Sequence, residues 1–261
     1  MGAQDSASAG RFAGRHIVVT GAGTGIGRAI ATRLSSEGAD LTLLARDVGR
    51  LEETAASCAG QARALSCDQR DRKAVDAAFA AAAEAGPLYA MVANAGIGGA
   101  NEPGDEDRFD DLVATNLSGT YHCFRAAQRH LEAGPGARHL VAISSILARI
   151  GVPAYTGYCA SKAGILGLVR ALAGELGPED IQVNAICPGW VDTAMAREGI
   201  DGMAAAMSVS AEQAYQIAMQ AVPMGRMSEP EDVAGMVSWL ISKDSRGVTG
   251  QGLDMNGGAY M

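Results

Sequence analysis

Two side chains with complementary acid–base properties, Tyr158 and Lys162, stand four residues apart in the segment YCASK. At this spacing, both side chains lie on one face of a helix. A phenol with its ordinary pKa of about 10 exchanges protons poorly at neutral pH, and a neighbouring ammonium group lowers that pKa. The pair therefore predicts proton transfer to or from an oxygen atom, with Tyr158 as the donor or acceptor.

Two further polar side chains can complete such a site. Ser145 ends the apolar run VAISS, thirteen residues before Tyr158, where its hydroxyl can hold a carbonyl oxygen. Asn116 lies in TNLSG, within a predicted helix, and can support a proton relay through water. We expect Asn116, Ser145, Tyr158 and Lys162 to form one catalytic group.

A glycine-rich loop, TGAGTGIG at residues 20–27, follows a short apolar run and precedes a helical pattern. A strand, glycines and a helix in this order place a phosphate at the helix N-terminus, where free N–H groups and the helix dipole attract it. The general pattern G-x-G-x-x-G and the Walker pattern both fail here, because position 26 is Ile and no lysine follows. The pattern T-G-x-x-x-G-I-G does fit, and it predicts nucleotide binding; a loop that only makes a tight turn is the alternative. The expected cofactor contacts are Gly21, Thr24, Gly25, Ile26 and Gly27.

The end of the next apolar run bears on the choice of cofactor. An acidic residue there would bind the ribose 2′-OH and select NAD. This chain instead has Ala45 followed by Arg46, whose guanidinium can bind a 2′-phosphate through several donors. The pair favours NADP(H) over NAD(H). The alternative is that Arg46 is a solvated surface charge offset by Asp47.

Short β-rich runs alternate with helical patterns along almost the whole chain. Several runs are continuously apolar, which is typical of parallel strands covered on both faces. We expect an α/β fold: one Rossmann-type, doubly wound parallel sheet of about seven strands, with helices on both faces and a ligand crevice at the strand C-termini. The predicted strands are 16–20, 40–45, 62–67, 88–93, 138–144, 181–186 and 252–255, and the clearest helical patterns are 26–37, 72–85 and 165–176.

One domain accounts for nearly all of the chain. Residues 1–13 are polar and small, and we expect a flexible tail there, followed by a single domain over 14–261. The stretch 188–210 is rich in Gly, Ala and Met and is predicted to be an irregular substrate loop. Its methionines, Met195, Met203 and Met207, can line an apolar pocket. Ordinary helical packing of the same residues is the alternative.

Composition excludes several classes of partner. The chain has 261 residues, 48% of them hydrophobic, and a net charge of −8, which disfavours nucleic acid. The five cysteines show no C-x-x-C spacing and indicate reduced thiols in the cytoplasm. No apolar run reaches the roughly 18 residues of a membrane span. We expect a cytoplasmic protein with a small-molecule substrate, no membrane or nucleic-acid partner, and no metal.

Taken together, these motifs resemble the short-chain dehydrogenase/reductase family in its compact form, from about residue 12 to the C-terminus. The motifs are TGAGTGIG, CD at 67–68, ANAG at 93–96, Asn116, Ser145, YCASK and PGWVDT at 188–193. The resemblance implies an enzyme that transfers a hydride between a nicotinamide cofactor and a ketone or secondary alcohol. A family member retained as a catalytically silent binding protein is the alternative of another class.

The resemblance also implies residue roles. Tyr158 exchanges the proton of the substrate oxygen, and Ser145 helps to hold that oxygen. Lys162 lowers the pKa of Tyr158 and binds the nicotinamide ribose, while Asn116 orders the relay water. Two departures from the family pattern, Ala93 and Gln69, touch no expected chemistry, and Ser144 is one place out of register. The cofactor residues so implied are Asp68 at the adenine, Asn94 with Ala95 and Gly96 at the ribose, and Pro188, Gly189, Val191 and Thr193 at the nicotinamide carboxamide.

The later half of the chain looks most like 3-oxoacyl carrier-protein reductases and polyketide ketoreductases. Those enzymes use arginines near the carrier docking site, where this chain has Gly136 and Glu179. A net charge of −8 also opposes an acidic carrier. A small ketone, a cyclic or other secondary alcohol, or an acyl-CoA is therefore favoured over a carrier-bound substrate. The resemblance further implies a homotetramer, for which Gly167, Ala171 and Ala173 would let a second helix pack closely.

Overall fold

Seven parallel strands form one sheet, in the order β3-β2-β1-β4-β5-β6-β7, in a computed structural model that describes residues 10–261. The strand order reverses between β1 and β4. β1 pairs in parallel with β2 on one side, Ile17 opposite Leu41, and with β4 on the other, Ile17 opposite Ala90. This reversal is the topological switch point of a doubly wound sheet. The predicted fold class is confirmed. The strands are β1 His16–Thr20, β2 Asp40–Ala45, β3 Ala62–Ser66, β4 Ala90–Ala93, β5 Arg138–Ile143, β6 Ile181–Pro188 and β7 Gly252–Met255.

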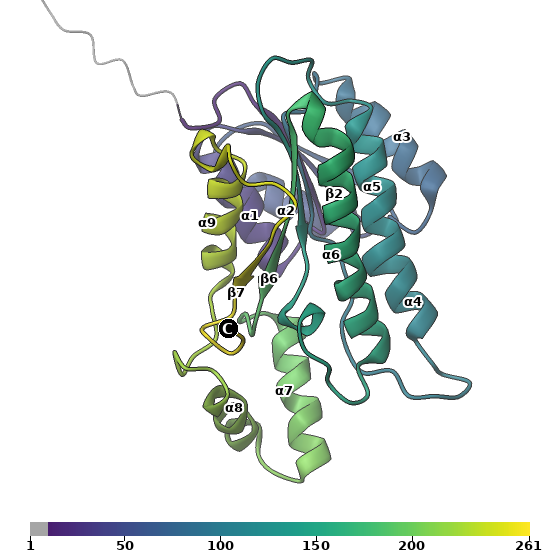
Figure 1. Ribbon diagram of the computed structural model, residues 1–261, viewed down its shortest axis with the longest axis vertical. Coiled ribbons are helices and arrows are strands. Elements are labelled where there is room, and N and C mark those ends of the chain that lie inside the picture. Colours follow the sequence, from purple (N-terminus) through teal and green to yellow (C-terminus); the bar gives the residue numbers. More distant parts are fainter. Residues whose placement is uncertain (1–9) are drawn as a thin grey trace, which may run out of the picture.

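Helices cover both faces of this sheet, and Figure 1 shows α3, α5 and α6 on one side with α1 and α9 on the other. Each face has its own apolar core. Phe79, Phe124 and Val169 are buried on the first face, and Ile30 and Val237 on the second. The helices are α1 Gly25–Ser36, α2 Val48–Ala56, α3 Arg72–Ala83, α4 Phe109–Val113, α5 Gly119–Gln128, α6 Thr156–Leu176, α7 Ala194–Met207, α8 Ala211–Gln220 and α9 Pro230–Leu240, with a π-helical segment η1 at Ala114–Ser118 and short 3₁₀ segments η2 Ile146–Ala148, η3 Gly177–Glu179 and η4 Lys243–Ser245.

The predicted strands differ from the observed ones only at their ends. β6 extends to Pro188 because its last residues pair with β7, Cys187 with Asp254 and Pro188 with Met255. β4 starts at Ala90 rather than at residue 88, since Leu88 makes only an isolated bridge with Leu131. The ends of these strands depend on which neighbouring strand each one pairs with, and the local sequence pattern carries no information about that partner.

The start of the folded domain lies earlier than expected. Residues 1–9 of the expected tail lie outside the described residues, but Phe12 is 1% exposed and its main-chain N–H donates to the carbonyl of Glu37 at 2.8 Å. Its ring packs beside Tyr89, with centroids 6.3 Å apart. The boundary at residue 14 is therefore too late, because one aromatic side chain anchors the segment before it.

The stretch 188–210 is largely helical, so the expectation of an irregular loop is wrong and the helical alternative holds. α7 begins after Thr193, whose hydroxyl accepts from the N–H of Ala196, and ends at Ser208 with a left-handed φ of 54°. Ala196, Ile200 and Ala204 repeat every four residues and pack against α8 in a small separate core. Two glycines within α7, Gly199 and Gly202, lower its apparent helix propensity. Figure 1 shows α7 and α8 projecting beyond one end of the sheet.

Candidate active site

The N-terminus of α1 is open to an anion. Thr24 occupies the N-cap position, no side chain among residues 10–261 caps the helix there, and its first turn contains no acidic residue. The first N–H groups of a helix have no partner within the helix, and the dipole gives that end a partial positive charge. The loop therefore fits the diphosphate of a dinucleotide.

Close packing explains why the loop needs glycine. Gly21 has a φ of +64°, and a Cβ atom on it would lie 2.7 Å from Cα of Ala95. A Cβ atom on Gly27 would lie 2.1 Å from the carbonyl oxygen of Gly21. Beside them, the Nδ2 group of Asn94 donates to the carbonyls of Thr20 and Gly21 at 3.1 Å each. The ends of β1 and β4 are thus joined at the switch point.

The remaining cofactor candidates of the loop lie at its open side. Gly25, with a φ of +50°, faces Thr193, whose Cγ2 atom would lie 3.2 Å from an added Cβ. Ile26 is half-buried and packs against the core on the α1 side. The loop and the start of α7 therefore border the same space from opposite sides, as a nicotinamide dinucleotide lying across the switch point requires.

Arg46, directly after β2, is exposed and has no ion-pair partner among residues 10–261. Asp47 does not pair with it. That carboxylate accepts from the main-chain N–H of Arg50 at 3.2 Å, as the cap of α2, and pairs with the Arg50 guanidinium at 3.3 Å. Asp47 therefore pairs with Arg50 rather than with Arg46, and the Arg46 guanidinium is exposed.

Asp68, after β3, is held by the guanidinium of Arg70 at 2.7 Å. The hydrogen bond from Arg70 is the main cause that holds the pKa of Asp68 below its ordinary value, and Arg46 contributes in the same direction. The carboxylate is thus ionised and can accept a hydrogen bond from an adenine amino group. The neighbouring departure, Gln69, is buried, and its Nε2 group donates to the carbonyls of Ala95 and Thr115.

Tyr158 lies in the first turn of α6, next to the end of β5. Burial is the main cause that raises its pKa above the ordinary value, and a side-chain hydrogen bond with Ser145 acts in the opposite direction. The sequence predicts that Lys162 lowers the pKa of Tyr158, but in the structure the pKa of Tyr158 is raised. The two serines have separate roles: Ser145 is next to Tyr158, whereas the hydroxyl of Ser144 donates to the main-chain carbonyl of Lys162 at 2.9 Å.

Lys162 is buried beneath Tyr158, one helical turn along α6. Its Nζ atom donates to the carbonyl of Ile143 at 2.9 Å and lies 5.6 Å from the centroid of the Tyr158 ring. Burial lowers the pKa of Lys162 to about 8. A nearby negative charge, including a phenolate, would favour the protonated form of this ammonium group.

Asn116 lies in the π-helical segment η1, not in a regular helix. Its Oδ1 atom accepts from the N–H of Ile97 at 2.9 Å, and its Nδ2 group donates to the carbonyl of Ile97 at 3.0 Å and to the Ser161 hydroxyl at 3.1 Å. A Cβ atom on Gly96 would lie 3.0 Å from Oδ1 of Asn116 and 3.5 Å from Nζ of Lys162. The Asn116 side chain therefore lies near Lys162, and the main chain of Ile97 and the Ser161 hydroxyl hold its amide in place.

The segment after β6 forms the far wall. The N–H of Gly189 donates to the carbonyl of Met255 at 3.0 Å, which holds the end of Pro188 beside β7. Val191 is buried and pairs with Ser228 in an isolated bridge. The Thr193 hydroxyl donates to the Val191 carbonyl at 3.2 Å, so the main chain of this turn is held rigid.

The structure also brings in residues that sequence reasoning missed. The Thr20 hydroxyl accepts from the N–H groups of both Asn94 and Ala95 at 3.1 Å, and Ser161 supports Asn116. Both belong to motifs already recognised, TGAG and YCASK, but no spacing rule distinguishes their partners. Arg50 lies over the glycine loop, with Cβ 3.0 Å from where a Cβ on Gly23 would be.

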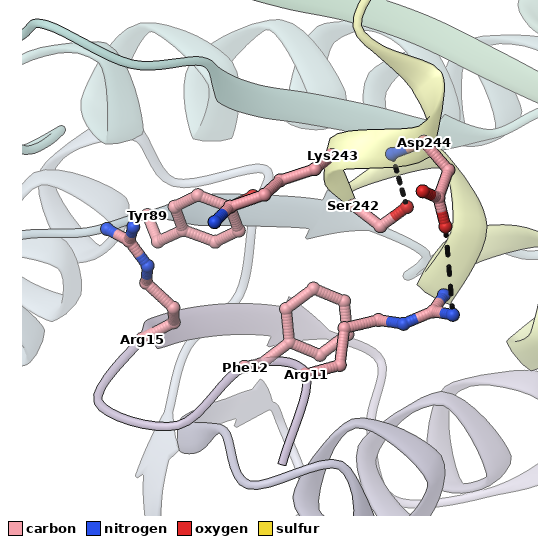
Figure 2. Close-up of a pocket in the computed structure, with 7 residues that line it drawn as sticks. All are labelled: Arg11, Phe12, Arg15, Tyr89, Ser242, Lys243 and Asp244. Carbon is pink, nitrogen blue, oxygen red and sulfur yellow. Dashed lines mark hydrogen bonds and ion pairs between the residues drawn. The ribbon is translucent and has the colours of Figure 1, made fainter. Parts of the chain in front are cut away.

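Two hollows of about 240 and 340 Å³ lie at the other end of the sheet. Figure 2 shows the first, with Arg11, Arg15, Tyr89 and Lys243 around it. These residues flank the N-terminal ends of β1 and β4, whereas the candidate catalytic residues follow strand C-termini. The hollows are therefore separate from the active site. Within residues 10–261, no cluster of three or more His, Cys, Asp or Glu side chains can hold a metal ion, and no helix has the length and apolar character to cross a membrane.

Comparisons with known proteins agree with this geometry. A family model described as enoyl-(acyl carrier protein) reductase matches residues 21–260. The chain is 32% identical to the 3-oxoacyl-[acyl-carrier-protein] reductase MabA of Mycobacterium tuberculosis over 96% of this chain and 94% of that protein. It is 32% identical to a (3R)-3-hydroxyacyl-CoA dehydrogenase of Rattus norvegicus over 94% and 95%. A crystal structure of a variant actinorhodin polyketide ketoreductase with NADPH superposes with a TM-score of 0.87, at 34% identity, over 96% and 98%.

Proposed function

The chain belongs to the short-chain dehydrogenase/reductase family, and on that premise we propose that it is an NADP(H)-dependent oxidoreductase that interconverts a ketone and a secondary alcohol. The observation that carries the proposal is the meeting of Ser145, Tyr158 and Lys162 at the C-terminal end of β5. A half-buried phenol, an adjacent hydroxyl and a buried ammonium form an acid–base site for one oxygen atom.

In this mechanism, the nicotinamide, when bound, supplies or accepts the hydride. For ketone reduction, the Tyr158 hydroxyl donates its proton to the carbonyl oxygen, which the Ser145 hydroxyl holds in place. Lys162 favours the resulting phenolate by its charge. Asn116, fixed to Ile97 and Ser161, supports the return of a proton to Tyr158.

The cofactor is held by the residues around the switch point. The free N–H groups of α1 bind the diphosphate, and Asp68 and Asn94 contact the adenosine and ribose parts. Arg46 binds the 2′-phosphate, supported by its exposure and by the pairing of Asp47 with Arg50. The polyketide ketoreductase similar in structure was solved with NADPH, which supports the same choice. The turn that contains Gly189, Val191 and Thr193 would hold the nicotinamide end.

The substrate is a ketone or acyl-CoA that arrives without a protein carrier. Gly136 and Glu179 lie together at the N-terminal end of β5, where Arg138 donates to both of their carbonyls, at 2.6 and 2.7 Å. Arg138 itself is buried. Gly136 has no side chain and Glu179 is acidic, so neither position offers an acidic carrier a positive charge.

The test is a substrate panel with NADPH and NADH, run in both directions. It contains small ketones, cyclic alcohols, a 3-oxoacyl-CoA, and the same acyl group on a carrier protein. Turnover of a free or CoA-bound substrate at kcat/KM at least equal to that of the carrier-bound form is expected. A strong preference for the carrier would reverse the substrate assignment. Binding of NADPH with no turnover of any substrate would favour the silent binding protein.

The proposed assembly is a homotetramer in the cytoplasm. All five cysteines are free thiols, as a reducing compartment requires. Along α6, Gly167 and Ala171 are exposed, whereas Ala173 is buried and lies 3.4 Å from the position of a Cβ on Gly250. Ala173 therefore packs within its own subunit, and only the first two residues remain candidates for contact with a second helix.

A further inference from the structure

Asn101, in the segment between β4 and α4, uses every polar atom of its side chain. It is 6% exposed. Its Nδ2 group donates to Oδ1 of Asp107 at 3.0 Å and to the Thr156 hydroxyl oxygen at 2.9 Å. Its Oδ1 atom accepts from the main-chain N–H of Gly157 at 2.9 Å, and its own N–H donates to the carbonyl of Ala154 at 2.8 Å. One side chain thus joins the segment after β4 to the start of α6.

The contact with Gly157 serves as a helix cap. α6 begins at Thr156, and within the described chain the N-cap residue, Tyr155, forms no side-chain cap of its own. The first N–H groups of a helix need a partner from outside the helix. Asn101 supplies an acceptor for one of them from a different segment. A Cβ on Gly157 would lie 3.3 Å from Oδ1 of Asn101 and 3.0 Å from Cδ1 of Leu112, so this close approach depends on glycine.

The capped turn is the one that contains Tyr158. The other end of the Asn101 segment touches the same catalytic group, since Ile97 exchanges two hydrogen bonds with Asn116. The segment 97–101 is therefore tied to η1 at one end and to the first turn of α6 at the other. A shift of α6 at its N-terminus would move the Tyr158 hydroxyl relative to Ser145.

We infer that Asn101 is a positioning residue for catalysis: it caps the catalytic helix from another segment and holds the Tyr158 hydroxyl in its working position. This inference rests on the proposed function. Asn101 does not touch the reacting atoms, and its effect is exerted through the main chain of Gly157. A displacement of about 1 Å in a reacting group can cost about 100-fold in rate.

The first test compares two helix-cap variants. Asn101→Ala is expected to lower kcat about 10- to 100-fold, with the dissociation constant for NADPH changed less than about twofold, because the hydrogen bonds of Asn101 go to Asp107, Ala154 and the start of α6 and not to the glycine loop or Arg46. Asp71→Ala is the matched control, since Asp71 caps α3 by accepting from Lys73 and Ala74, at 2.8 and 3.3 Å. It should lower the melting temperature by a similar amount and leave kcat within twofold. Equal effects of both variants on kcat would overturn the inference.

A double-mutant cycle gives a readout that a purely structural role would not move. If Asn101 acts through Tyr158, Asn101→Ala should have no further effect on the residual rate of Tyr158→Phe. Additive losses would overturn the inference. Should Asn101→Ala fail to bind NADPH, Asn101→Asp combined with Asp107→Asn keeps the acceptor for the Gly157 N–H without placing two carboxylates in contact, and it should retain more than a tenth of wild-type kcat. A lower value with NADPH binding intact would count against the cap. Wild-type turnover by the Tyr158→Phe variant would refute the proposed function itself.

Discussion

The Nζ atom of Lys162 lies 5.6 Å from the centroid of the Tyr158 ring, and the two residues are one helical turn apart on α6. Burial acts on both, raising the pKa of the phenol and lowering that of the ammonium to about 8. Each group is thereby brought closer to neutrality. When Tyr158 gives its proton to a substrate oxygen, the phenolate that remains and the Lys162 ammonium stabilise each other's charge.

The first prediction removes the proton donor. Tyr158→Phe should lower kcat at least about 10³-fold, within the range for loss of acid–base catalysis, because the phenylalanine ring has no proton to give to the substrate oxygen. NADPH binding, measured by fluorescence titration, should persist. Tyr121→Phe on the exposed side of α5 is the matched control and should leave kcat unchanged. Near-normal turnover by the Tyr158 variant would refute the mechanism.

The second prediction concerns pH. Lys162 is protonated below its pKa of about 8 and neutral above it, so the charge that favours the phenolate is lost as the pH rises. The value of kcat/KM for NADPH in ketone reduction, which reports on the free enzyme, should be level to about pH 8 and then fall about tenfold per pH unit. A steady-state profile from pH 6 to 10 checks this. A level profile through pH 9.5 would contradict it.

The third prediction concerns cofactor choice. Because Asp47 pairs with Arg50, Arg46 can give a charge-assisted contact of about 1.5–3 kcal/mol to a 2′-phosphate. This corresponds to a preference for NADPH over NADH of roughly 10- to 150-fold in kcat/KM. Ala45→Asp with Arg46→Leu should reverse the preference, since it adds repulsion and removes attraction. Arg63→Leu, an exposed arginine on β3, should change nothing. Equal use of NADH by the wild type would mean that Arg46 is only a surface charge.

The fourth prediction concerns stability. Burial, together with the charges of Arg138 and Arg15, lowers the pKa of His139 from 6.5 to about 4. The unfolded chain therefore binds a proton first, so the stability is complete above pH 6.5 and is lost as the pH falls toward 4. At pH 5 the loss is about 2 kcal/mol. Urea unfolding at pH 7 and pH 5 should show this drop in the wild type and a smaller one in His139→Gln. An identical drop in both proteins would exclude His139 as its source.

The fifth prediction concerns assembly. A Cβ on Gly167 of α6 would meet no atom of the described chain within 4 Å, leaving aside its own helix backbone and sequence neighbours, so a larger side chain fits the single subunit. Gly167→Leu should therefore reduce a tetramer to dimers or monomers without lowering the melting temperature of the subunit. Gly202→Leu on α7, where the surroundings are equally open, is the control. Light scattering at micromolar concentration checks both variants. A monomeric wild type would refute the tetramer.

Local sequence determined the alternation of strands and helices. Each predicted strand is present within two residues of its expected ends, because a continuous apolar run has few ways to bury itself other than in a covered parallel sheet. The motif residues also gather as expected, since the glycine loop, Ser145 and Asn94 each follow the C-terminal end of a strand. Parallel strands bring such positions to one edge.

Only the tertiary structure decided which side chains meet. Asp47 has two arginines nearby in sequence, and the helical turn of α2 selects Arg50 rather than Arg46. Asn101 caps a helix that begins 55 residues later, a contact that no spacing rule contains. The glycines of α7 weaken its helical pattern in the sequence. The helix is stabilised by packing of its apolar face on α8, which lies further along the chain. Periodicity records which way a side chain faces, whereas its partner depends on the path of the whole chain.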